Sequence, residues 1–274
     1  MKIIDFHMHA GDFSLLREDI QELLTRKPFD EGYGINDVFS NPSKLVEYVE
    51  NLNSQRAVIF AECGPGTNFS IDGELIVNFC SKEKKLIPFG NINPNHHNVP
   101  EEFEKNIRLG VKGFKFYPAD HGFDPYTDEM MSVYKQCATL NKPIVFHTGL
   151  TAQRNTEQKF IQPNEYVRLV ETFPDLTLIM AHTGNPTWND EALELVSTYD
   201  NLYTDTGLVP VSKWNEIYSH RPNAENKILF GSDFPVCGSY SVLIKSIVEL
   251  DIDVELKNKI MFANADRLLK KLNI

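Results

Sequence analysis

Two histidines lie one residue apart near the start of the chain, in the run "DFHMH" at residues 5–9. In a β-strand the side chains of residues i and i+2 point to the same face. His7 and His9 would therefore project together, with Asp5 behind them on the same side. Two imidazoles on one face can bind a metal ion, but this short motif gains weight only from partners elsewhere in the chain.

Such partners follow other apolar runs. They are Lys115 and Tyr117 in "VKGFKFYP", His147 in "PIVFHTG", His182 in "LTLIMAHTG", Asp205 in "NLYTDTG" and Asp233 in "KILFGSDFP". Buried imidazoles and carboxylates are costly unless they are paired or bind a metal. Four candidate ligands would offer three nitrogens and one or two oxygens, a set that suits zinc, with manganese, iron or cobalt as alternatives. These ligands are His7, His9, His147 and Asp233.

The same residues suggest a hydrolytic mechanism. A catalytic zinc lowers the pKa of its water to about 7, which provides hydroxide at neutral pH. His182 could act as general acid or base, and Asp233 could also hold the attacking water and take its proton. Tyr117 shares a face with Lys115 and could hold substrate. Arg154, in the loop "TAQRNTEQ", could pair with a substrate carboxylate.

The elements that must position these residues alternate along the chain. Eight short runs rich in β-branched and aromatic residues are separated by stretches with helical spacing, including one that starts at Ser43 as N-cap and one that ends at Gly110. This alternation predicts βαβ units and a parallel sheet. Eight strands favour closure into a (β/α)8 TIM barrel, in which chemistry lies at the C-terminal strand ends. An open doubly wound sheet is the alternative, but no G-x-G-x-x-G follows the first strand.

No linker or low-complexity tract divides the chain, so we predict a single domain over residues 1–274. Residues 10–42 form a long insertion after the first strand. An insertion of this length between a strand and its helix is more often functional, or a cover, than neutral.

Composition narrows the partners and the location. A net charge of -11 argues against nucleic acid and anionic membranes, and no apolar stretch approaches the ~20 residues of a membrane span. The start of the chain lacks a signal-peptide pattern. The four cysteines, at 63, 80, 137 and 237, include no CxxC pair, which argues against a structural zinc knuckle and favours free thiols in the cytoplasm. Homodimerisation stays open.

Two adjacent histidines, His96 and His97, fall outside the strand ends. Neighbouring side chains on a strand point to opposite faces, so the pair would diverge on any strand. We therefore expect both to be surface residues.

Several motifs, in order and across nearly the whole chain, resemble the amidohydrolase superfamily. The closest likeness is to the amidohydrolase-2 branch, which is related to aminocarboxymuconate semialdehyde decarboxylase. The matching pieces are "DFHMH", "KGFKFYP", "FHTG", "AHTGNPTW", "GSDFP" and "FANADRLL". The resemblance implies that His7 and His9 are the first pair of metal ligands, that His147 is a third, and that Asp233 is the eighth-strand acid.

The resemblance leaves the metal count open. His182 matches a histidine that is a ligand in binuclear members and often the catalytic histidine in mononuclear ones. Lys115 matches a lysine whose carbamate bridges two metals in binuclear members, whereas in single-metal relatives it can stay a cation near the substrate. We favour one divalent metal per chain over two.

We therefore expect a metal-dependent hydrolase whose metal-bound hydroxide attacks an amide, ester or lactone of a small substrate. One alternative is non-oxidative decarboxylation of a small unsaturated or aromatic acid at the same metal. An alternative of another class is a non-catalytic barrel that binds a ligand. Substrate specificity lies in the loops and does not follow from the fold.

Overall fold

The computed structural model describes residues 1–64, 67–151 and 159–274. Eight parallel strands pair in sequence order. They are β1 (Ile3–Met8), β2 (Ser54–Phe60), β3 (Leu86–Gly90), β4 (Gly113–Phe116), β5 (Ile144–Phe146), β6 (Leu178–Met180), β7 (Leu202–Asp205) and β8 (Ile228–Leu229). Between β8 and β1, Phe6 N–H donates to the Phe230 carbonyl at 2.7 Å. The sheet is thus a nearly closed (β/α)8 barrel, as the sequence predicted.

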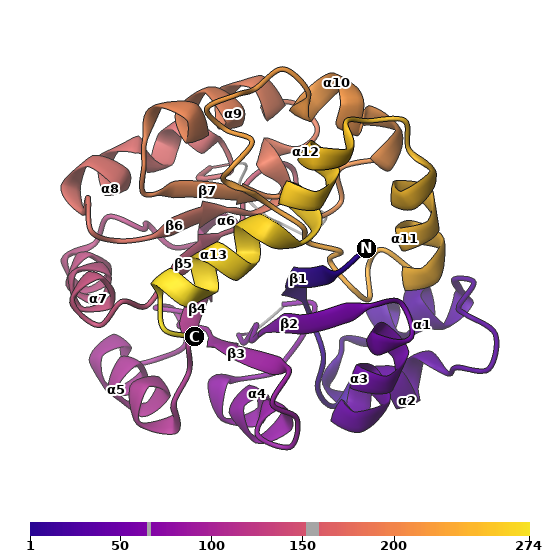
Figure 1. The fold of residues 1–274 in the computed structure, drawn as a ribbon. Helices are drawn as coiled ribbons and strands as arrows, with labels where there is room; N and C mark the ends of the chain where they lie inside the picture. The colour runs from indigo at the N-terminus through magenta and orange to yellow at the C-terminus, as the bar shows by residue number, and fades with distance from the viewer. Residues whose placement is uncertain (65–66, 152–158) are drawn as a thin grey trace.

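Helices alternate with the strands and surround them (Figure 1). They are α1 (Glu18–Arg26), α2 (Ile35–Ser40), α3 (Pro42–Glu50), α4 (Gly73–Cys80), α5 (Val99–Leu109), α6 (Pro118–His121), α7 (Asp128–Thr139), α8 (Val167–Thr172), α9 (Asn189–Thr198), α10 (Trp214–Tyr218), α11 (Tyr240–Glu249), α12 (Val254–Asn258) and α13 (Asn264–Lys271). Short turns are η1 (Phe13–Leu15), η2 (Pro163–Tyr166), η3 (Ala181–Gly184), η4 (Val211–Lys213) and η5 (Lys259–Ala263). Within the described residues, no helix is both long and apolar enough to cross a membrane.

The ends of two helices test the helix caps that the sequence predicted at Gly110 and Ser43. Gly110 ends α5 in the left-handed conformation, with φ 93°, which confirms the predicted cap. The predicted N-cap at Ser43 is wrong. Asn41 caps α3, its side chain accepting from the Ser43 N–H at 3.0 Å. Pro42 then occupies the first helical turn, where its fixed φ and missing N–H cost nothing, so the helix begins earlier.

The barrel interior is apolar at its N-terminal end. Ile4 and Phe6 of β1 belong to one buried cluster with Leu268, Leu269 and Leu272 from the last helical segment. Figure 1 shows α13 lying across this end of the barrel. Because α13 closes that end, a substrate must enter from the opposite, C-terminal end of the strands.

The segment between β1 and α3 contains η1, α1 and α2, and it contacts two loops at the C-terminal rim. Arg17 N–H donates to the Asn68 carbonyl in the loop after β2 at 3.1 Å. Asp30 accepts from the Ser241 N–H at 3.1 Å, at the start of α11. The insertion therefore borders the open end of the barrel.

Candidate active site and metal centre

A cavity of about 150 Å³ lies at the C-terminal ends of the strands. Its polar lining includes the four histidines that the sequence placed at strand ends, together with Asp233. Its apolar lining comes from Phe69, Leu150, Leu208 and Val236. The barrel therefore brings residues from four different strand ends into one small space, as its topology requires.

The first strand presents both of its histidines to this cavity, but Asp5 does not follow them. The register of β1 against β2 shifts between Asp5 and Met8, which breaks the simple alternation of faces. Asp5 Oδ1 instead accepts from the backbone N–H groups of His7, at 3.0 Å, and Ser232, at 3.1 Å. The expectation that Asp5 stands behind His7 and His9 is therefore wrong. Its carboxylate holds the backbone of β1 to the segment after β8.

Asp233 meets both histidines of the first strand. Its Oδ1 lies 3.3 Å from His7 Nε2 and 3.5 Å from His9 Nε2. The candidate ligand atoms of these three buried residues all lie within 4.8 Å of one another. Burial lowers the pKa of His9 to about 4, so its imidazole is neutral and has a free electron pair for a metal.

Asp205, at the end of β7, was noted at a strand end but was given no role in the predicted site. Its Oδ2 accepts from His7 Nδ1 at 2.9 Å, while its Oδ1 accepts from the N–H groups of His182 and Gly207, both at 2.9 Å. Burial raises the pKa of Asp205, but the adjacent His7 and its hydrogen bond outweigh burial and leave the pKa lowered. A carboxylate held this way fixes His7 with its proton on Nδ1, which leaves Nε2 for a metal.

His182 lies beside His7 and His147, with ring centroids 4.8 and 4.7 Å away. Its Nδ1 is 3.0 Å from the Gly207 carbonyl, which can only accept, so Nδ1 carries the proton. Burial and the neighbouring His147 lower the pKa of His182 well below its ordinary value. Its Nε2 is therefore an unprotonated base at neutral pH.

The backbone around these groups is unusual. His182 and Asp233 have φ of 64° and 55°, in the left-handed region that side chains with a Cβ seldom adopt. Their N–H groups are held by Asp205 Oδ1 and by the His7 carbonyl, the latter at 2.9 Å. Gly207 must be glycine, since a Cβ there would lie 2.8 Å from His182 Nδ1. Strain of this kind gathers where side chains must be aimed at a site.

His147 follows β5 and also faces the cavity. Its Nε2 is buried and, within the described part of the chain, has no hydrogen-bond partner. A buried nitrogen left unpaired is costly unless something else binds it. By donor type and proximity, a divalent metal fits the group formed by His7, His9 and Asp233. His147 is not part of this close group, but its unpaired Nε2 belongs to the same cavity and has the donor type of a further ligand.

The described residues contain another group of potential ligands, formed by His7, His182 and Asp205. His7 Nδ1 and both oxygens of Asp205 are already engaged in the hydrogen bonds given above. This second group therefore supports the first one rather than offering an independent set of free donors.

Lys115 lies in β4, one residue before its end, and is fully buried. It is not among the residues that line the cavity, and its Nζ has no hydrogen-bond partner among the described residues. The ammonium lies 5.0 Å from the ring centroid of Phe60 and 5.2 Å from that of Tyr117, both within cation–π range. Burial lowers the pKa of Lys115 to about 8, against the opposing charges of Asp205 and Asp233. The amine is therefore mostly charged at pH 7.

The other predicted substrate contacts have different outcomes. Tyr117 lines the cavity. Arg154 lies outside the described residues. Glu62 also lines the cavity and accepts from the Asn68 N–H at 3.1 Å. Asp120 in α6 lines it too and received no attention in the sequence. No local pattern in the sequence marks Asp120, because it reaches the cavity from a short helix after β4.

Comparison with known proteins agrees with this architecture. The amidohydrolase family model (Amidohydro_2) matches residues 4–271, and the chain belongs to this family of metal-dependent enzymes. A search of curated proteins gave no match.

Solved structures of similar shape include enzymes of two kinds. A probable 2-pyrone-4,6-dicarboxylic acid hydrolase from Acinetobacter baumannii has 14% identity and a TM-score of 0.66, with 98% of this chain and 100% of that chain covered. A 2,6-dihydroxybenzoate decarboxylase from Rhizobium has 13% identity and a TM-score of 0.69, with 99% of each covered. A 5-carboxyvanillate decarboxylase from Novosphingobium aromaticivorans, complexed with manganese, has 13% identity and a TM-score of 0.66, with 98% and 96% covered. At this identity the likeness shows the fold.

Proposed function

We propose that the protein is a metal-dependent hydrolase that cleaves an amide, ester or lactone of a small anionic substrate. The observation that carries the proposal is the convergence of His7, His9 and Asp233, next to a His182 imidazole whose Nε2 is unprotonated. His147 completes the proposed ligand set, with one metal per chain. Zinc suits these donors, and manganese, which is bound in a structural neighbour, is the next candidate.

A bound divalent metal supplies Lewis acidity to the substrate carbonyl and lowers the pKa of an attacking water. Asp233 is ionised and orients that water by accepting one of its hydrogens. His182 Nε2 takes the proton as the water oxygen bonds to the carbonyl carbon. The bond to the leaving nitrogen or oxygen then breaks, and His182 returns the proton to the leaving group.

Lys115 supports an anionic substrate. Its charged amine is buried, lacks a hydrogen-bond partner in the described structure and belongs to the strand end beside His147. A substrate carboxylate would give this amine the partner that it lacks. Tyr117 and the apolar side chains of the cavity would contact the rest of a small molecule.

Decarboxylation is the second candidate, because several of the structural neighbours are named decarboxylases. Lys115 and the metal ligands would serve that reaction equally well, since it also begins with a bound carboxylate. Hydrolysis uses a positioned base for water, and the free Nε2 of His182 provides one. We therefore rank hydrolysis first.

A substrate panel tests this order. The zinc- and manganese-loaded enzyme is assayed with simple lactones, esters and amides, and in parallel with carboxylated phenols and muconate-like acids for release of carbon dioxide. We expect hydrolysis that His182→Gln slows about 10²–10⁴-fold and that His220→Gln, at an exposed position, leaves unchanged. Carbon dioxide release at a higher kcat/KM than any hydrolysis would reverse the two candidates.

A further inference from the structure

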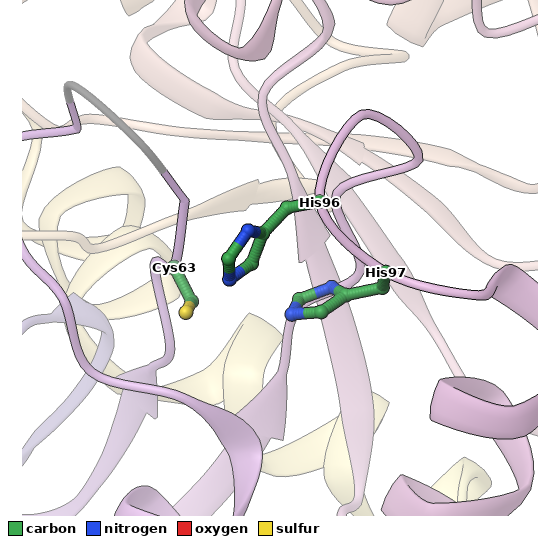
Figure 2. Close-up of side chains that lie close together, drawn as sticks. All are labelled: Cys63, His96 and His97. Atoms are coloured by element: carbon green, nitrogen blue, oxygen red, sulfur yellow. The ribbon is translucent and has the colours of Figure 1, made fainter.

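A second group of metal-ligating side chains lies outside the active-site cavity. Cys63 follows β2, and His96 and His97 lie in the turn after β3. Their candidate ligand atoms are all within 4.8 Å of one another. Figure 2 shows the thiol and both imidazole rings turned toward the same point. The cavity lining in the described structure includes none of the three.

The sequence predicted that His96 and His97 diverge, and the structure shows why they do not. The prediction assumed a strand, whereas both residues lie in a turn in which both N–H groups donate to the Asn93 carbonyl, at 2.9 and 2.8 Å. The two ring centroids are consequently 4.8 Å apart. His96 is exposed and His97 is half-buried, so the expected surface position is correct for His96 and only partly so for His97.

The surroundings of this cluster favour a cation. Asp72 and Glu102 lie close enough to interact electrostatically with the Cys63 side chain. These carboxylates make the local potential negative. Lys105 opposes them, but its Nζ is paired with Glu74 at 3.2 Å and lies 3.8 Å from Asp72. A divalent cation that binds the Cys63 sulfur would displace the thiol proton. The cation would then interact favourably with the nearby carboxylates.

A fourth residue supports the same view. His121 is 7% exposed, and both of its ring nitrogens lack hydrogen-bond partners among the described residues. The rings of His97 and His96 interact electrostatically with that of His121. Asn95, next to His96, donates to the His121 carbonyl at 2.8 Å. The His121 backbone therefore adjoins the turn that carries His96 and His97, although its ring is not part of the group of atoms within 4.8 Å.

We propose that Cys63, His96 and His97 form a second site, for a thiophilic divalent cation of the zinc class. One thiolate sulfur and two imidazole nitrogens are the ligand types that zinc prefers, and three protein ligands leave a fourth position for water or another side chain. A search for CxxC pairs misses such a site, because the site contains a single cysteine. Its two histidines come from a different loop, which only the fold brings close to Cys63.

Binding at this site must change one hydrogen bond. The Asn93 N–H donates to His97 Nδ1 at 3.0 Å, so the neutral ring carries its proton on Nε2. His97 can bind a metal through Nε2 only if the ring's remaining proton is on Nδ1, and the Asn93 amide must then release it. The Asn93 amide thus reports occupancy of the second site independently of any activity.

Occupancy would also join two loops at the rim of the active site. Cys63 directly follows Glu62, which lines the central cavity, and the Cys63 N–H donates to Asn91 Oδ1 at 3.2 Å. A metal held between the loops after β2 and β3 would restrain the backbone next to Glu62. It would also stabilise the folded state by mass action, because the three ligands converge only in the fold.

Cobalt(II) distinguishes the two sites, because only the second contains sulfur. Full-length protein is titrated with cobalt(II) while the near-ultraviolet thiolate-to-cobalt charge-transfer band is recorded. We expect the band to reach its plateau with one equivalent per chain beyond the central site. Cys63→Ser should abolish it, and His96→Gln and His97→Gln should each weaken binding about tenfold or more, since each removes one of three ligands. Cys237→Ser is the matched control, because Cys237 is also half-buried and lies after β8 near Asp233.

Three outcomes would overturn the proposal: no band in the wild-type protein, a band that survives Cys63→Ser, or a band that Cys237→Ser removes. The exposed His96→Gln variant keeps the test valid if Cys63→Ser does not fold. Backbone NMR provides the second measurement. The Asn93 amide signal should shift with the second equivalent in wild-type protein and stay in place in His96→Gln.

Discussion

The central site and the Cys63 cluster offer similar ligand atoms but differ in what holds them. His7 and His9 are 1% and 4% exposed at the end of a barrel strand, and a buried carboxylate fixes the protonation of His7. His96 is exposed in a turn, and a backbone amide holds His97 with its proton on the nitrogen that a metal needs.

In the proposed central site, the ligand side chains already have the protonation that metal binding requires. In the Cys63 cluster, the ligands must change their protonation before a metal can bind. In the central site, the hydrogen bonds of Asp205 already give His7 the protonation that ligation requires. In the Cys63 cluster, a thiol proton must be lost and a hydrogen bond broken. We therefore expect the central site to bind metal more tightly and to depend less on pH than the peripheral one. Four variants test the central half of this comparison.

The largest effect should come from removing the first pair of proposed ligands. His7→Ala combined with His9→Ala should strip the central metal and reduce turnover by about 10³-fold or more, since a catalytic metal contributes several kcal/mol. Elemental analysis and the cobalt charge-transfer band are measured on the same sample. Full metal content at the central site in the double variant would refute the assignment, and loss of the charge-transfer band as well would mean that the two sites are not independent.

Removing the proposed base should be the next largest effect. His182→Gln should keep the central metal and lose about 10²–10⁴-fold in kcat, the usual contribution of a positioned acid or base. Metal content is measured alongside kcat, with His220→Gln as control. Loss of metal in proportion to activity would make His182 a ligand and would favour two metals in the centre.

Asp205→Asn tests whether the hydrogen bond from His7 to Asp205 is the reason that the central site binds metal more tightly than the Cys63 cluster. The amide keeps the shape but cannot accept all three hydrogen bonds of the carboxylate, and it no longer favours the correct protonation of His7. We expect metal affinity to fall about 10- to 100-fold. Competition with a chelator measures the affinity. An unchanged value would show that the barrel positions His7 without Asp205.

Lys115 should give the smallest effect, and the size of its effect on stability depends on pH. Its pKa falls to about 8 in the folded protein, from an ordinary value of 10.5, so the charged amine is less stable folded than unfolded. This penalty, up to about 3 kcal/mol, is complete below pH 8 and fades as pH rises toward 10.5.

Lys115→Met should therefore raise the Tm at pH 7 and much less at pH 10, as thermal unfolding at both values will show. The same variant should raise KM for an anionic substrate by about tenfold and retain its metal. A carbamate on Lys115 between two metals would instead make the variant lose metal, which mass spectrometry and elemental analysis would detect.

The sequence alone determined the barrel and the position of most of the central residues. Apolar runs that alternate with helical stretches are a local property, and parallel strands in sequence order place all their C-terminal ends together. One cavity therefore contains the strand-end residues that the sequence singled out, namely His7, His9, His147, His182 and Asp233. They could be found in advance because the end of a strand can be located from the sequence alone. The resemblance to the amidohydrolase family predicted the same fold, and the family match over residues 4–271 confirmed that the chain belongs to this family.

Only the tertiary structure decided the contacts between side chains from different strands and loops. The register shift in β1 turned Asp5 away from the site, and the distances across the barrel made Asp205 the support of His7 and His182. A turn brought His96 and His97 together beside Cys63, where a strand would have separated them. These arrangements depend on contacts between residues far apart in the chain and on backbone conformations such as that of His182. Local patterns in a sequence contain neither.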